Sequence, residues 1–125
     1  MNIYTSYFAN MKKLDKEKYT FISISLYPPK WYEGKVYKKV APSNEILMDW
    51  KNGKKDEEAR SHYERMYSFK ILRKLNAKDI LKDLEELSEG KDIVLLCFEK
   101  SGDFCHRYLL SKFLEKELSI LIEEL

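Results

Sequence analysis

The residues that decide the fold read IVLLCF at positions 93–98. They form the longest unbroken apolar run in the chain, and they are bounded by Asp92 on one side and Glu99 on the other. A short, continuously apolar run is typical of a strand that is covered on both faces of a parallel sheet. We therefore expect a buried central strand here, with a turn and a helix directly after it.

The region before this strand predicts two further strands. Residues 3–8 are rich in β-branched and aromatic side chains and indicate a strand, followed by a short helical turn over 9–14. Residues 21–26 alternate between apolar and polar and end at Pro28-Pro29, which no strand interior tolerates. Residues 30–40 show no helical period and are expected to form a long loop, with a loose hairpin as the alternative.

Apolar side chains at three- and four-residue steps predict four helices. The expected helices are a short one capped by Ser43 and closed by Asn52-Gly53, a longer one from Asp56 to Asn76, one from Lys78 to Ser88, and a last one from near Phe104 with an inward stripe reaching Leu125. Strands separated by helices predict an α/β fold. We expect one small three-layer domain over residues 1–125, with a mainly parallel sheet and helices on both faces.

Composition narrows the class of protein. A length of 125 residues suits one domain, and 44% apolar with 35% charged residues is a globular mixture, which argues against a disordered tail or a membrane protein. The apolar runs are too short for a membrane span, and Lys12 and Lys13 interrupt the region where a secretory signal needs an apolar stretch. A cytoplasmic location is expected. The net charge of +2 is too small to indicate a nucleic-acid coat.

Chemistry-bearing residues are densest where the buried strand turns into the last helix. Cys97 and Glu99 are followed by Cys105, His106 and Arg107. Without a secretory signal, the two cysteines are expected to be thiols rather than a disulfide. Cys97 is expected in the core, and Glu99 just past the strand end is the acid/base candidate.

The start of the last helix suggests two kinds of chemistry. If Asp103 caps this helix, Cys105 and His106 lie in its first turn, where the helix dipole and the Arg107 charge favour a thiolate. Cys105 is then a nucleophile, or else a thiol packed beneath the helix. The same N–H groups and Arg107 equally suit a phosphate.

The ends of the strands predict the rim of a site. Parallel sheets bind ligands beyond the carboxyl ends of their strands, which selects residues 5–8, 26–29 and 98–105. We expect Arg107 and Cys105 to line one pocket with Tyr7 or Ser6. The alternative is that Arg107 is consumed by a buried pair with Glu99.

No metal or other cofactor is expected. The two cysteines and His106 are three possible ligands, but a closed zinc site needs four, and His62 is the only other histidine.

The loop over residues 27–39 interleaves aromatic residues with lysines. Trp31 offers a ring for stacking on a base, and Lys38 and Lys39 offer charges for phosphates, so nucleic acid is a possible partner. A surface flap whose rings cover the sheet is the favoured interpretation, because the total charge is near neutral.

Several motifs together resemble a known family. They are residues 5–8 (TSYF), 22–24 (ISI), 41–43 (APS), the region 63–67, and above all LLCFEK at 95–100 with CHR at 105–107. This combination resembles the domain of unknown function 488 family over nearly the whole chain, and the last motif is the specific one. The resemblance implies a compact α/β fold with a pocket built from these motifs, and it implies no established reaction.

We expect an enzyme that acts on a phosphate-bearing or nucleotide-like small molecule, with Cys105, His106 and Glu99 as catalytic residues. The ligand-binding residues are expected to be Arg107, Tyr7, Ser6 and Cys97. The alternative is a non-catalytic module that binds a small anionic ligand or nucleic acid. No membrane partner is expected, and the sequence indicates no oligomeric state.

Overall fold

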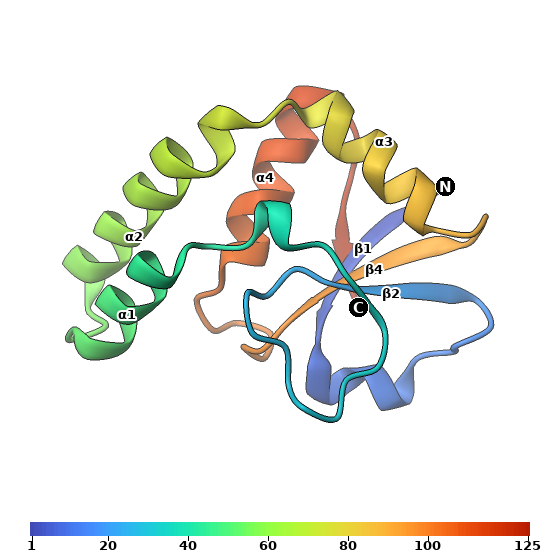
Figure 1. The fold of residues 1–125 in the computed structure, drawn as a ribbon, viewed down its shortest axis with the longest axis horizontal. Coiled ribbons are helices and arrows are strands. Elements are labelled where there is room, and N and C mark those ends of the chain that lie inside the picture. The colour runs from blue at the N-terminus through green and yellow to red at the C-terminus, as the bar shows by residue number, and fades with distance from the viewer.

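The computed structural model describes residues 1–125 and contains one five-stranded parallel sheet (Figure 1). The strands lie in the order β3-β2-β4-β1-β5. Their bounds are β1 Ile3–Tyr7, β2 Tyr19–Ser23, β3 Lys35–Val36, β4 Asp92–Cys97 and β5 Glu123–Glu124. The α-helices are α1 Asn44–Asn52, α2 Glu57–Lys70, α3 Ala77–Leu87 and α4 His106–Leu118, and the 3-10 helices are η1 Phe8–Lys13, η2 Lys38–Val40 and η3 Leu72–Lys74.

Strand β4 is the centre of the sheet. It pairs with β1 on one side and β2 on the other, and its residues 93–96 are completely buried. The predicted central strand is therefore confirmed, as is the α/β class. Strand β2 lies somewhat earlier than the predicted residues 21–26.

The two faces of the sheet carry different layers. All four α-helices lie on one face, where they pack on alternate strand residues such as Ile22, Ile93 and Leu95 (Figure 1). The other face is covered by η1 and by the segment around Tyr32, which pack on Phe21 and other β2 and β4 residues. The three layers are thus an α-helical layer, the sheet, and a thin layer of 3-10 helix and loop.

Side-chain caps set the helix starts. Ser43 accepts a hydrogen bond from the Ile46 N–H, and Asp56 accepts one from the Ala59 N–H, as expected for N-caps. The long helix predicted from Asp56 to Asn76 is too long, because α2 ends at Lys70 and η3 follows. Asn76 is the N-cap of α3 and accepts from two backbone N–H groups there.

Two short edge strands were not predicted. The loop over residues 30–40 contains β3, which pairs with the end of β2. The apolar stripe to Leu125 predicted a continuous last helix, but Ser119 has a φ of 53° and ends it. Residues 123–124 then pair with β1 as β5. Tertiary pairing with an open sheet edge overrides the local helical pattern here.

Tyr67 connects α2 to the segment before α1. Its hydroxyl donates a 2.6 Å hydrogen bond to the Val40 carbonyl, and both residues are completely buried. Replacing Tyr67 with phenylalanine leaves this carbonyl without its partner, so we expect a loss of about 1 to 3 kcal/mol of stability. Urea unfolding of Tyr67→Phe measures this loss, and a variant as stable as the wild type would contradict it.

None of the helices has both the length and the apolar composition that crossing a bilayer requires.

Candidate functional site

A pocket lies where β2 and β4 end, between these strand ends and helices α1, α2 and α4. The cavity itself has a volume of about 70 Å³, and the empty space reaches about 430 Å³ when the solvent at its open mouth is included. The lining residues are Ser25, Leu26, Leu47, Trp50, Tyr63, Cys97, Phe98, Glu99, Phe104, Cys105 and His106. Two of the three predicted rim segments, at the ends of β2 and β4, thus contribute to it.

Three aromatic rings form one wall of the pocket. The ring centroid of Phe104 lies 4.9 Å from that of Trp50 and 5.0 Å from that of Tyr63, and Trp50 and Tyr63 are 5.9 Å apart. Trp50 comes from α1, Tyr63 from α2, and Phe104 from the turn before α4. The rings therefore hold each other in place before any ligand arrives.

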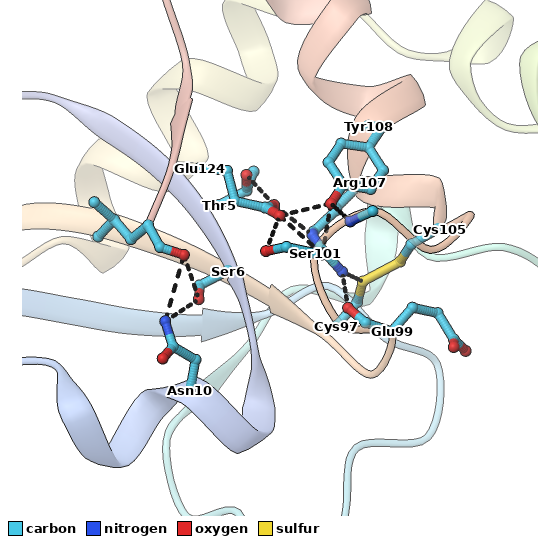
Figure 2. A network of polar contacts seen from close by, with 12 residues as sticks. Thr5, Ser6, Asn10, Cys97, Glu99, Ser101, Cys105, Arg107, Tyr108 and Glu124 are labelled. Atoms are coloured by element: carbon cyan, nitrogen blue, oxygen red, sulfur yellow. Dashed lines mark hydrogen bonds and ion pairs between the residues drawn. A yellow bond between two sulfur atoms is a disulfide. The ribbon is translucent and has the colours of Figure 1, made fainter.

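Glu99 supplies the carboxylate of the pocket. Its backbone carbonyl accepts a hydrogen bond from Arg107, whereas its carboxylate has no partner within the protein and points away from that network (Figure 2). Burial raises the pKa of the nearby Tyr63 hydroxyl, and the negative charge of Glu99 raises it further. The carboxylate is thus exposed and lies near a phenol that burial keeps protonated.

Arg107 lies inside the protein and does not line this pocket. Its side chain is 0% exposed, and all five of its N–H groups find an acceptor. The Nε and one Nη2 hydrogen go to Glu124 at 2.7 and 3.2 Å, and the other Nη2 hydrogen goes to the Tyr108 hydroxyl at 2.9 Å. Nη1 donates to Cys97 Sγ at 3.0 Å and to the Glu99 carbonyl. The buried pair of Arg107 is therefore formed with Glu124 and not with the Glu99 carboxylate.

Glu124 is the acceptor that organises this network (Figure 2). Besides the guanidinium, its carboxylate accepts from Ser101 at 2.6 Å, from Tyr108 at 2.6 Å and from Thr5 at 3.0 Å. Burial works to raise the pKa of Glu124, but the hydrogen bonds from Arg107, Ser101 and Tyr108 outweigh it and lower the pKa to about 2. Strand β5 thus places a permanent negative charge beside Arg107.

Tyr7 and Ser6 do not join the pocket. Ser6 is completely buried, donates to the Leu125 carbonyl at 3.3 Å and accepts from Asn10 at 3.1 Å. The Tyr7 ring lies 6.0 Å from the Arg107 guanidinium carbon, on the side of the buried network. The predicted grouping of Arg107 and Cys105 with either residue around one pocket is therefore wrong, because Glu124 and the β1 end enclose the guanidinium.

Cys97 and Cys105 form a disulfide in this structure, so the prediction of two free thiols is wrong (Figure 2). The turn between the two cysteines brings the end of β4 back to the start of α4, and neither the spacing of the cysteines nor the expected compartment shows this. Cys105 is also the N-cap of α4, in place of the predicted Asp103. Its sulfur is bonded to Cys97 and is not a free nucleophile here.

His106 is a buried, neutral residue. Its Nε2 lies 2.8 Å from the Ile24 carbonyl, which only accepts, so Nε2 carries the proton and Nδ1 faces Cys105 Sγ at 3.8 Å. Burial lowers the pKa of His106 to about 4, because it outweighs the opposing effect of the Ile24 hydrogen bond, and the Arg107 charge adds a smaller lowering. His106 therefore offers a lone pair, and not a positive charge, toward the disulfide.

The possible ligand atoms of Cys97, Cys105 and His106 lie within 4.8 Å of one another. Because the two sulfurs are bonded to each other, His106 Nδ1 is the one ligand atom of this group that is free. A closed zinc site needs four ligands. The expected lack of a metal stays a prediction.

The aromatic and basic residues of the 27–39 segment do not gather on one surface. Trp31 contacts Phe8 on the η1 side of the sheet, with ring centroids 6.3 Å apart. Lys39 instead lies 3.5 Å from the Asp83 carboxylate of α3, on the opposite side, and Lys38 next to it is exposed. The structure thus gives nucleic acid no joint surface of Trp31, Lys38 and Lys39.

Two parts of the site carry no clear signal in the sequence. The first is the aromatic wall of Trp50, Tyr63 and Phe104, of which only Tyr63 falls within a motif of the family resemblance, at residues 63–67. Glu124 carried no signal, since one acidic residue in an acidic C-terminal region is indistinguishable from a solvated charge.

Comparisons with known proteins identify a family. The family DUF488-N3a, described as the active DUF488-N3 subclade, matches residues 6–118. No curated protein and no solved structure matches the chain. The match includes the LLCFEK and CHR motifs that surround the pocket and the buried arginine, and it spans most of the 125 residues. The chain therefore belongs to the DUF488 family, in its N3a subclade.

Proposed function

We propose that this protein is an enzyme that binds a nucleotide-like small molecule by its flat ring and moves a proton on it with Glu99. The observation that carries the proposal is a free carboxylate at a pocket whose wall is three preassembled aromatic rings. Such a combination, at the carboxyl ends of parallel strands, is typical of a small-molecule site. The description of the matched subclade as active is in line with an enzyme.

The pocket favours a flat heterocycle. Trp50, Tyr63 and Phe104 line the pocket, and stacking of a base on an aromatic ring contributes about 1 to 3 kcal/mol. The Glu99 carboxylate accepts hydrogen bonds, and amino or ring N–H groups of a base supply them. The polar and apolar parts of a nucleobase thus match the two parts of the pocket.

Glu99 is suited to act as a general base. Its backbone is held by a completely buried arginine, while its carboxylate stays free to meet a ligand. A base must be fixed within hydrogen-bonding reach of the proton that it takes. The Arg107 network supplies this positioning without neutralising the carboxylate, because the arginine charge is paired with Glu124.

A phosphate on the ligand requires a cation other than Arg107. The guanidinium carbon of Arg60 lies 5.2 Å from the Phe104 ring centroid, and Arg60 is exposed. This places a positive charge beside the aromatic wall. In this proposal the ring is held by the pocket and a phosphate is directed toward Arg60.

A thermal-shift series with nucleosides and their 5′-monophosphates tests the binding step. We expect at least one nucleoside to raise the melting temperature, since a ligand of the folded form stabilises it. Trp50→Ala should weaken that binding about tenfold or more through lost stacking. Trp31→Ala is the matched control, because Trp31 is exposed and lies outside the pocket. A series in which no nucleoside or nucleotide shifts the melting temperature contradicts the proposal.

The catalytic step is tested with the ligand that binds. Glu99→Gln keeps the shape of the side chain and removes its basicity, so conversion followed by chromatography should fall at least about a hundredfold while binding is retained. Glu123→Gln, an exposed residue on β5, is the control for the lost charge. Binding without any conversion by the wild type would instead identify a non-catalytic binding module.

A further inference from the structure

The Cys97–Cys105 bond closes the turn that carries one wall of the pocket. Cys97 is the last residue of β4 and Cys105 the residue before α4, and Phe98, Glu99 and Phe104 lie between them. Both cysteines line the pocket. The disulfide is therefore buried at the edge of the core, next to a solvent-connected hollow.

The two sulfurs have different surroundings. Cys97 is 1% exposed, and its Sγ accepts a hydrogen bond from the Arg107 guanidinium at 3.0 Å. Cys105 is 6% exposed, begins helix α4 and faces His106 Nδ1 at 3.8 Å. The guanidinium is thus placed to stabilise negative charge on Cys97, whereas Cys105 is the less deeply buried of the two residues.

We propose that Cys97 and Cys105 are a reversible dithiol–disulfide pair in which Cys105 is the attacked sulfur and Cys97 the leaving thiolate. The reaction partner is a thiol of low molecular mass, or a protein dithiol. This activity does not depend on the proposed binding of a nucleotide-like ligand.

The exchange takes place in two steps. The thiolate of the partner attacks Cys105 Sγ, the Cys97–Cys105 bond breaks, and Cys97 leaves as a thiolate beside Arg107. A second thiolate attacks the partner sulfur of this mixed disulfide and releases Cys105 as a thiolate, which takes up a proton from solvent. Cys97 either remains a thiolate beside Arg107 or also takes up a proton from solvent. Two thiols are oxidised to one disulfide while the protein disulfide is reduced to two thiols.

The surroundings favour a reversible pair over a purely structural one. Thiol–disulfide exchange is faster when the leaving thiolate is stabilised, and a nearby arginine does this. The start of helix α4 favours a thiolate on Cys105 in the same way. Both effects stabilise the reduced state, which makes a disulfide easier to reduce.

Mapping of the first exchange step tests the proposal in the wild-type protein. The folded disulfide form is treated with reduced glutathione, quenched in acid at intervals and analysed by peptide mass spectrometry. We expect reduction without denaturant, with the transient glutathione adduct on Cys105. A bond that is reduced only after unfolding, or an adduct located on Cys97, would overturn the proposal.

Two single variants provide a matched pair. The Cys97→Ser variant keeps Cys105 as its single cysteine, and the Cys105→Ser variant keeps Cys97. Each variant is reacted with an aromatic disulfide reagent in the folded and in the denatured state. Cys105 should react at least about tenfold faster than Cys97 in the folded proteins, and at a similar rate in the denatured ones. Equal folded rates contradict the assignment of Cys105 as the attacked sulfur. Circular dichroism shows whether each variant is folded. If a variant does not fold, the adduct mapping on the wild-type protein tests the proposal instead.

Discussion

Replacing Glu124 with glutamine is expected to lower the free energy of unfolding by about 3 to 5 kcal/mol. The substitution leaves the Arg107 guanidinium completely buried without the carboxylate that neutralises it. A buried, unpaired charge is among the most destabilising features a protein contains. The corresponding fall in melting temperature is on the order of 10 to 20 °C for a domain of this size. Urea unfolding and calorimetry measure both quantities.

The neighbouring Glu123 is the control for this experiment. It lies on the same strand but is exposed, so Glu123→Gln removes the same charge without touching the buried network. A Glu124→Gln protein as stable as Glu123→Gln would show that Arg107 does not depend on its carboxylate partner. In the double variant Arg107→Met/Glu124→Leu the buried charges are both absent, and we expect it to be more stable than Glu124→Gln.

Acidification from pH 7 to pH 4 is expected to remove about 3 kcal/mol of stability through His106 alone. The folded-state pKa of His106 is lowered to about 4, from an ordinary value of 6.5. A lowered folded pKa means that the unfolded chain binds the proton more readily between these two values. The contribution is therefore fully present above pH 6.5 and is lost as the pH falls through 4.

Unfolding by urea at several pH values, with His106→Gln and His62→Gln, measures this effect. His106→Gln should flatten the decline between pH 6.5 and 4, whereas the exposed His62 should leave it unchanged. A decline of the same steepness in His106→Gln contradicts the assignment. Glu124 acts in the same direction at lower pH, because its pKa falls from 4.5 to about 2 on folding and its contribution is lost over that range.

The elements whose signals are local can be predicted from the sequence. The IVLLCF run at 93–98 indicated a buried strand because apolar residues without alternation need cover on both faces. Ser43 and Asp56 indicated helix starts because their side chains satisfy nearby backbone N–H groups. The sequence also predicts that the LLCFEK and CHR motifs lie at the edge of the sheet where ligands bind, since parallel sheets place the carboxyl ends of their strands together.

Which groups pair with each other depends on the three-dimensional arrangement of the chain. Whether Arg107 meets a ligand, Glu99 or Glu124 depends on strand β5 docking on the edge of β1, and long-range pairing has no local pattern. The Cys97–Cys105 bond likewise depends on the path of the turn between β4 and α4. Electrostatic and covalent partners are selected by distance in three dimensions, whereas the sequence displays only spacing along the chain.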